Sequence, residues 1–266
     1  MTTKVLKFMQ AAGAFAPFRF AHRGKALVLM YHRFSLGEHG PGLPVRVFRE
    51  QLDYLTAHYQ IVPLSYLATL LNSGRPVPPR TAVITIDDAC RDAYAVAFPL
   101  LRARRIPATA FVISGFIDRS VTLPDRPPEE SAPIDWDQAR EMDRTGVEIG
   151  SHTATHPILT NVDAERLHRE LWDSRRRIED ELHRRVDLFC YPNGGLNAEV
   201  RQAVRRAGYM CAVTSEPGFN DDHSDVFALR RISTEPDLPR FIQSTSGFGD
   251  LKIRMLYGAT AARRHA

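Results

Sequence analysis

Short apolar runs alternate with helical patterns along most of the chain, and this alternation restricts its fold more than any other feature. The apolar run at 25–34 is followed by Phe48, Leu52, Leu55 and Tyr59, which recur at helical spacing. Further strands are predicted at 81–87, 109–114, 147–152, 187–192, 209–215 and 227–233. Strands separated by helices form a mainly parallel sheet, so the sequence predicts an α/β fold.

The number of repeated units favours a barrel. About seven strand and helix units in one chain are more typical of a (β/α) barrel than of an open doubly wound sheet. The 266 residues suit one domain, because such barrels use roughly 200–250 residues. We therefore expect a single domain over 25–245, preceded by a segment at 1–24 and followed by a tail at 246–266.

The charge of the chain argues against a nucleic-acid partner. Thirty-five Lys and Arg residues stand against 31 Asp and Glu residues, a net charge of +4. The arginine-rich stretch at 175–185 is interrupted by Glu179 and Glu181 and follows Glu170, and this mixture predicts the solvated outer face of a helix. The three cysteines, Cys90, Cys190 and Cys211, form no CxxC pair and are predicted to be free thiols.

The segment at 1–24 has two interpretations. Its apolar stretch is interrupted by Pro17 and Arg19 and lacks the pattern of an export signal, so we expect a cytoplasmic protein. The segment is then either a helix packed on the body of the fold or an amphipathic segment on the inner face of the membrane. The second interpretation implies peripheral membrane association.

Polar residues follow several predicted strands at the point where each strand ends. These clusters are Tyr31-His32, Asp87-Asp88, His152 with His156, and the residues 191–194. Because the carboxyl ends of parallel strands meet at one end of a barrel, we expect the clusters to form one site.

Asp88, His152 and His156 have the chemistry of a metal site. Two imidazoles and one carboxylate can hold a divalent ion and leave a position open for water, the arrangement of catalytic zinc. We expect one such ion, zinc first and cobalt, nickel or manganese as alternatives. Asp87 points away from its neighbour and can take a proton from water whose pKa the metal lowers. The predicted chemistry is metal-assisted hydrolysis.

Three motifs resemble, in order and spacing, those of the polysaccharide deacetylase family, carbohydrate esterase family four. They are TIDDA at 85–89, SHTATHP at 151–157 and FCYPNG at 189–194. The resemblance runs from about residue 25 to about residue 240. It implies a distorted, incomplete (β/α) barrel that removes N-acetyl groups from amino sugars of a glycan with zinc or a similar ion.

The resemblance also implies individual roles. Asp87 takes the place of the general base, and Asp88, His152 and His156 take the places of the metal ligands. The backbone N–H of Asn193 takes the place of an oxyanion donor. Tyr31, Tyr191 and Pro192 stand where residues that line a substrate site are expected.

Three departures from the family pattern matter for activity. Ala89 replaces a glycine, and a positive φ at that position would strain the turn that holds Asp88. Cys190 stands where many members have an arginine that orients the base. We hypothesise that Arg231 replaces this arginine. The alternative is a surface salt bridge at Arg231, because Arg230 and Arg231 must point to opposite sides of a strand and only one of them can face the base.

The third departure concerns the general acid, because the family's late histidine motif has no counterpart here. His32, directly after the first predicted strand, is the best-placed residue to protonate the leaving amine. The loop at 118–134 could form a lid or rim. A small-molecule cyclic amide hydrolase and a non-catalytic glycan-binding barrel remain as alternative functions, and the sequence selects neither the glycan nor the oligomeric state.

Overall fold

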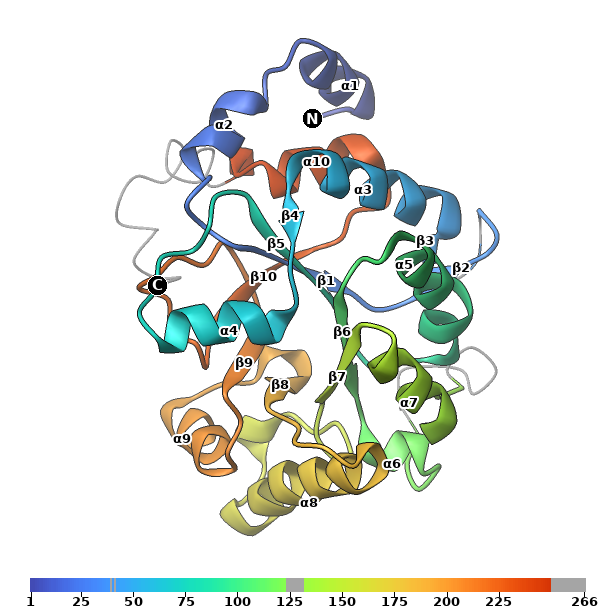
Figure 1. Ribbon diagram of the computed structural model, residues 1–266, viewed down its shortest axis with the longest axis vertical. Helices are drawn as coiled ribbons and strands as arrows, with labels where there is room; N and C mark the ends of the chain where they lie inside the picture. Colours follow the sequence, from blue (N-terminus) through green and yellow to red (C-terminus); the bar gives the residue numbers. More distant parts are fainter. Residues whose placement is uncertain (39, 41, 123–131, 250–266) are drawn as a thin grey trace.

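Seven parallel strands form a closed ring at the centre of the molecule (Figure 1). The computed structural model describes residues 1–38, 40, 42–122 and 132–249. The strands of the ring are β1 (Leu27–Tyr31), β5 (Thr81–Ile86), β6 (Ala108–Val112), β7 (Val147–Ser151), β8 (Leu188–Cys190), β9 (Cys211–Pro217) and β10 (Leu229–Ser233). β1 pairs with both β5 and β10, which closes the ring. The predicted (β/α) barrel of seven units is confirmed.

The contact between β1 and β5 closes the ring with an unbroken register, from Leu27 opposite Ala82 to Tyr31 opposite Ile86. On its other side, the first half of β5 pairs with β4 (Gln60–Ile61) and the second half with β6. The short strand β4 therefore lies beside the ring and is no part of it. A separate pair, β2 (Phe34–Ser35) with β3 (Leu43–Pro44), follows β1.

Apolar side chains fill the amino-terminal half of the ring, and one helix covers them. Val28 and Val83, near the starts of β1 and β5, share a buried cluster with Leu64 and Leu67 of α4 (Leu64–Asn72). Glu148 of β7 accepts hydrogen bonds from the backbone N–H and the hydroxyl of Ser65 in the same helix. α4 therefore closes the interior of the ring at its amino-terminal end, and the polar groups that follow the strands gather at the carboxyl-terminal end.

Helices cover the outside of the ring, and their apolar faces form the larger buried cluster. They are α3 (Val45–His58), α5 (Phe98–Arg104), α6 (Ser114–Ile117), α7 (Trp136–Arg144), α8 (Ala164–Leu182), α9 (Ala198–Arg206) and α10 (Leu238–Thr245). Four of them begin at a side chain that accepts a hydrogen bond from an amide of the first turn. These capping residues are Asp135, Asp163, Asn197 and Asp237.

One predicted helix has a different geometry. The apolar pattern after Asp92 predicts a single helix, but the structure has a π-helical turn, η1 (Ala93–Ala97), followed by α5. Pro99 lies at the start of α5 and has no N–H, so the regular hydrogen-bond ladder cannot run through it. The predicted loop at 118–134 and the tail at 246–266 lie largely outside the described residues.

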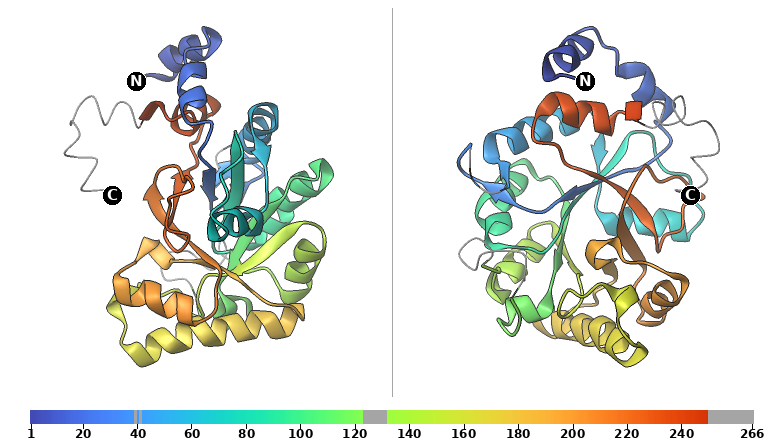
Figure 2. Two further views of the ribbon diagram at one scale, coloured as in Figure 1. Left: turned by 60° about the vertical axis from the view of Figure 1, so that its left-hand side comes forward. Right: turned by 180° about the vertical axis from the view of Figure 1, so that it is seen from behind.

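The N-terminal segment forms two helices, α1 (Thr3–Ala11) and α2 (Ala16–Ala21), and α1 contacts α10 at one edge of the barrel (Figure 2). Leu6 and Phe15 are buried, and the ring of Phe15 lies edge-on to Phe248 with the centroids 5.7 Å apart. Phe8 and Phe20 are exposed to solvent. Within the described residues, no helix has both the length and the apolar character needed to cross a membrane.

Two phenylalanines of this segment offer a matched test of its packing. We expect Phe15→Ala to lower the free energy of unfolding by about 3–5 kcal/mol, because it empties a buried site. Phe20→Ala removes the same ring from an exposed position and should change it by less than about 0.5 kcal/mol. Urea unfolding measures both values. Equal effects would mean that the segment does not pack on the barrel.

Candidate active site

The two aspartates follow β5 in a strained turn at the carboxyl-terminal end of the barrel. Asp88 and Ala89 both have positive φ, 65° and 41°. Ala89 therefore has the positive φ at which an alanine strains this turn. Nine described non-glycine residues have positive φ, and Asp88, Ala89, Thr153, His156 and Asn193 are among them. A left-handed residue other than glycine costs about 1–3 kcal/mol, so a large share of the backbone strain lies at this site.

The loop after β7 carries the two predicted metal-binding histidines. Thr153 and His156 have φ values of 71° and 60°, and the backbone N–H of His156 donates to the hydroxyl of Thr153 over 2.9 Å. The carboxylate of Glu170 in α8 accepts from the backbone N–H groups of Ala154 and Thr155, at 3.0 and 2.8 Å, and from the Thr155 hydroxyl. These bonds hold the loop in the conformation that turns both imidazoles inward.

Glu170 corrects one sequence prediction. We expected it on the solvated face of its helix, but it is 4% exposed. Leu167, Leu171 and Ser174 are buried on the same helix, and Glu170 lies between them at helical spacing. This spacing from Leu167, Leu171 and Ser174 is the sequence feature that indicates an inward position for Glu170, although its charge is typical of a solvated face.

The three predicted metal ligands converge. Oδ1 of Asp88 lies 3.5 Å from Nε2 of His152 and 3.6 Å from Nε2 of His156, and the three ligand atoms all lie within 4.8 Å of one another. Nδ1 of His152 forms a 2.8 Å hydrogen bond with the backbone oxygen of Cys190, which directs Nε2 toward Asp88. Two imidazoles and one carboxylate at this spacing fit a divalent ion with an open coordination position.

Asp87 forms a buried ion pair with Arg231 of β10. The guanidinium donates from Nη1 to Oδ1 and from Nη2 to Oδ2 of Asp87, both over 2.7 Å, and the arginine is 1% exposed. Burial alone would raise the pKa of the Asp87 carboxyl, but the charge and hydrogen bonds of Arg231 outweigh it and hold the pKa below its usual range. The geometry supports the hypothesis that Arg231 orients this carboxylate, while Arg230 lies on the outer side near Glu216.

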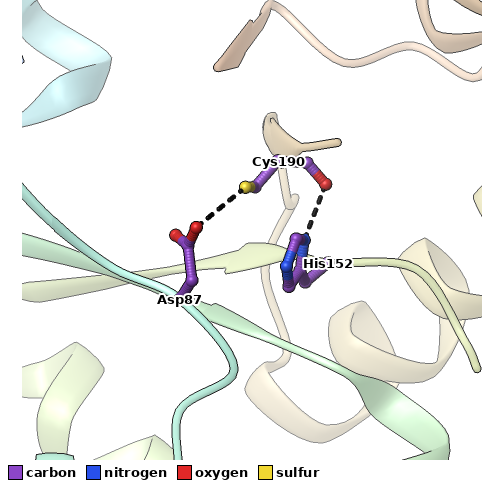
Figure 3. Close-up of side chains that lie close together, drawn as sticks. All are labelled: Asp87, His152 and Cys190. Atoms are coloured by element: carbon purple, nitrogen blue, oxygen red, sulfur yellow. Dashed lines mark hydrogen bonds between the residues drawn. The ribbon is translucent and has the colours of Figure 1, made fainter. Parts of the chain in front are cut away.

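Cys190 lies against this ion pair, and Figure 3 shows its sulfur facing Asp87. Its Sγ is 3.5 Å from Oδ2 of Asp87 and 3.3 Å from Nη2 of Arg231. Asp87, His152 and Cys190 are also close enough to form a second metal-binding group. Burial raises the pKa of the Cys190 thiol well above its usual value, and a protonated thiol is a poor ligand. The set of Asp88, His152 and His156 therefore fits a metal better. All three cysteines are free, as predicted.

A family model for polysaccharide deacetylases matches residues 74–212 of this chain. The chain belongs to the polysaccharide deacetylase family. The matched region contains both aspartates, both histidines and Cys190, so the resemblance of the three motifs is confirmed. Members of this family are hydrolases that act on amide bonds of glycans, and they depend on a metal ion.

Curated relatives and solved structures agree with this assignment. The Bacillus subtilis protein YxkH is 28% identical over 85% of this chain and 75% of its own length. The poly-beta-1,6-N-acetyl-D-glucosamine N-deacetylase of Escherichia coli K12 is 26% identical over 73% of this chain, which spans 34% of that enzyme. The structure of a Streptococcus pyogenes deacetylase in complex with acetate superposes with a TM-score of 0.74 at 24% identity, over 84% of this chain and 98% of the other.

His32, the predicted general acid of this polysaccharide deacetylase, is partly exposed to solvent. Its side chain is 41% exposed, and Nε2 lies 3.7 Å from Oδ2 of Asp87. The neighbouring residues fix its position, because Tyr31 is buried in the core and Nε of Arg33 donates to Asp92 over 2.6 Å. The imidazole is therefore close to the base and accessible to a substrate.

The predicted substrate-binding residues lie deeper than the sequence suggested. The hydroxyl of Tyr31 donates to Gln51 over 3.0 Å, and that of Tyr191 donates to the backbone oxygen of Phe227 over 2.9 Å. Both tyrosines are 1% exposed, and Pro192 is buried at the start of the short 3-10 turn η3 (Pro192–Gly194). These contacts give all three residues a supporting role below the site.

Asn193, the predicted oxyanion donor, lies in the exposed turn that follows β8. Its φ of 53° is left-handed. Within the described part of the chain, the Asn193 side chain makes no hydrogen bond with Asp87 or with the three metal ligands. Its backbone role stays a prediction.

The ion pair of Asp87 and Arg231 makes a testable contribution to stability. We expect Arg231→Met to lower the free energy of unfolding by about 3–5 kcal/mol, because it leaves a buried carboxylate unpaired. The double change Arg231→Met with Asp87→Asn should regain most of that loss. Arg230→Met, on the outer side of the same strand, is the matched control and should cost less than about 0.5 kcal/mol. Urea unfolding of these variants tests the pairing, and equal losses at positions 230 and 231 would contradict it.

Proposed function

We propose that this chain removes N-acetyl groups from the amino sugars of a glycan by hydrolysis at a zinc site. One observation carries the proposal. Asp88, His152 and His156 converge within 4.8 Å directly beside a carboxylate, Asp87, that a buried arginine holds in place. Membership of the polysaccharide deacetylase family and the names of relatives that deacetylate poly-N-acetylglucosamine support the substrate class.

Asp88, His152 and His156 would hold the ion. When bound, a divalent ion supplies Lewis-acid chemistry to the acetyl carbonyl and lowers the pKa of water. Zinc suits two imidazoles and one carboxylate with an open position, and we propose it over cobalt, nickel and manganese for that reason. The hydrogen bond from His152 to the Cys190 backbone and the bonds of Glu170 to the loop hold the donor atoms in place before an ion binds.

Asp87 is the proposed general base. It accepts a proton from the attacking water, whose oxygen forms the new bond to the acetyl carbon. Arg231 keeps both carboxylate oxygens in one orientation and keeps the group ionised. The breaking C–N bond leaves an amine that needs a proton, and His32 is the proposed donor, because its imidazole lies 3.7 Å from Asp87. The products are acetate and a free amino sugar.

Metal content is the first test of the site. We expect about one divalent ion per purified chain, measured by atomic emission after incubation with zinc. His152→Ala removes a ligand and should lose the ion. His168→Ala, an exposed histidine that stacks on Trp172 in α8, is the matched control and should retain it. A wild-type protein that stays empty would overturn the proposal and favour a non-catalytic glycan-binding barrel.

The role of His32 is tested by changing the leaving group. We expect His32→Ala to lower kcat on an N-acetylated oligosaccharide by about 10²–10⁴-fold, because the amine can no longer be protonated in the transition state. Hydrolysis of 4-nitrophenyl acetate should fall much less, since 4-nitrophenolate leaves without a proton. Zinc content should not change.

His223→Ala provides the control for His32, because His223 is an exposed histidine with 90% of its side chain accessible. This variant should keep full activity on both substrates. Full turnover of the oligosaccharide by His32→Ala, or equal losses on the amide and the ester, would rule out His32 as the general acid.

A further inference from the structure

A basic pocket of about 450 Å³ lies at the amino-terminal end of the barrel, opposite the candidate active site. Lys25, Tyr59 and Arg80 line it, and each directly precedes a strand or the bridge that leads into one. Its volume is within the range of small-molecule sites, about 300–1,000 Å³. The pocket is therefore a separate site by position, and it does not depend on the proposed deacetylation.

Backbone hydrogen bonds between distant segments build this pocket. The N–H of Arg80 donates to the backbone oxygen of Arg23 over 2.8 Å, and the N–H of Gln60 donates to that of Arg80 over 2.7 Å. Asn220 and Ala26 exchange backbone hydrogen bonds at 3.0 and 2.6 Å. Four segments of the chain, at 23–26, 60, 80 and 220, are thus fixed around one concave surface, so the basic side chains meet through the fold itself.

Positive charge dominates the pocket. Arg19, Arg23, Lys25, His58 and Arg80 line it, and no described lining residue is an aspartate or glutamate. Arg19 donates to the neutral hydroxyl of Tyr54 over 3.3 Å, while Lys25 lies 3.6 Å from Asp221 at the rim. Burial and the charges of Arg19 and Arg80 lower the pKa of His58, so this imidazole favours its neutral form and the positive charge of the pocket comes from the arginines and Lys25. Such a field attracts an anion.

Aromatic rings form the rest of the wall. Phe20, Tyr59 and Phe219 line the pocket, and the guanidinium of Arg23 lies 3.8 Å from the ring centroid of Phe20. Phe20 is 65% exposed, so it presents an apolar surface at the mouth. A ligand that joins an anionic group to an apolar or aromatic group would match both parts of the wall.

We propose that this basic pocket binds a phosphate ester, with the phosphate between Arg19 and Arg80 and the organic part against Phe20. Guanidinium groups bind phosphate oxygens through paired hydrogen bonds, and the two arginines approach from different segments, α2 and the loop before β5. The ester can be a soluble phosphorylated metabolite or the head group of phosphatidic acid, the phospholipid whose phosphate is a monoester. The shared chemistry is a phosphate monoester beside an apolar group.

Titration with phenyl phosphate, followed by calorimetry, tests the proposal. We expect saturable binding by the wild-type protein and about tenfold weaker binding by Arg19→Gln and by Arg80→Gln. Arg75→Gln is the matched control, because Arg75 is an exposed arginine outside the pocket and the change removes the same charge. Circular dichroism checks that all variants are folded. Absence of saturable binding by the wild type, or an equal loss in all three variants, would overturn the proposal.

Two further experiments distinguish a membrane lipid from a soluble phosphate ester as the ligand of the pocket. Co-sedimentation with phosphatidylcholine vesicles that contain phosphatidic acid measures binding to a lipid head group, and vesicles with phosphatidylglycerol control for surface charge. Preference for phosphatidic acid that Arg80→Gln abolishes assigns the pocket to a membrane lipid. Binding of phenyl phosphate without that preference assigns it to soluble esters. Inorganic phosphate should bind more weakly than phenyl phosphate, and equal affinity would contradict the role of Phe20.

Discussion

The buried ion pair between Asp87 and Arg231 is the interaction on which the candidate site depends. Arg231 comes from β10 and Asp87 follows β5, and β1 lies between these two strands in the ring. The pair can form only if the ring closes through β1 in the observed register. A buried carboxylate without this partner would be costly, so the stability of the barrel and the orientation of the base rest on the same contact.

The strain at the site has a structural explanation. Two left-handed residues follow β5, and two more lie in the loop after β7. Hydrogen bonds compensate for part of this cost, since Thr153 and Glu170 hold the loop at three of its backbone amides. The ligand atoms are therefore placed by the protein scaffold. Ala89 is buried and has a φ of 41°, so its Cβ is held in the left-handed region at the expense of some stability.

Much of the fold and of the metal site was predictable, because both depend on local patterns. Apolar runs mark the strands of the ring, and the polar groups directly after β5 and β7 form the site where the strands end. The closure of the ring was less predictable, because it depends on contacts between segments that are far apart in the sequence. The sequence shows that Arg230 and Arg231 point to opposite sides, but only the closed ring determines which of them faces Asp87. The inward position of Glu170 and the supporting role of Tyr31 also follow from packing between distant elements.

The helix α4 across the amino-terminal end of the ring has a consequence for the path of a substrate. Val28, Val83 and Leu67 pack together below the site, so the residues that the structure describes fill the barrel interior and leave no tunnel through it. A polymer cannot be threaded from end to end. It must lie across the open mouth and leave by the side from which it came. Such a geometry does not require the end of a glycan chain to enter the barrel.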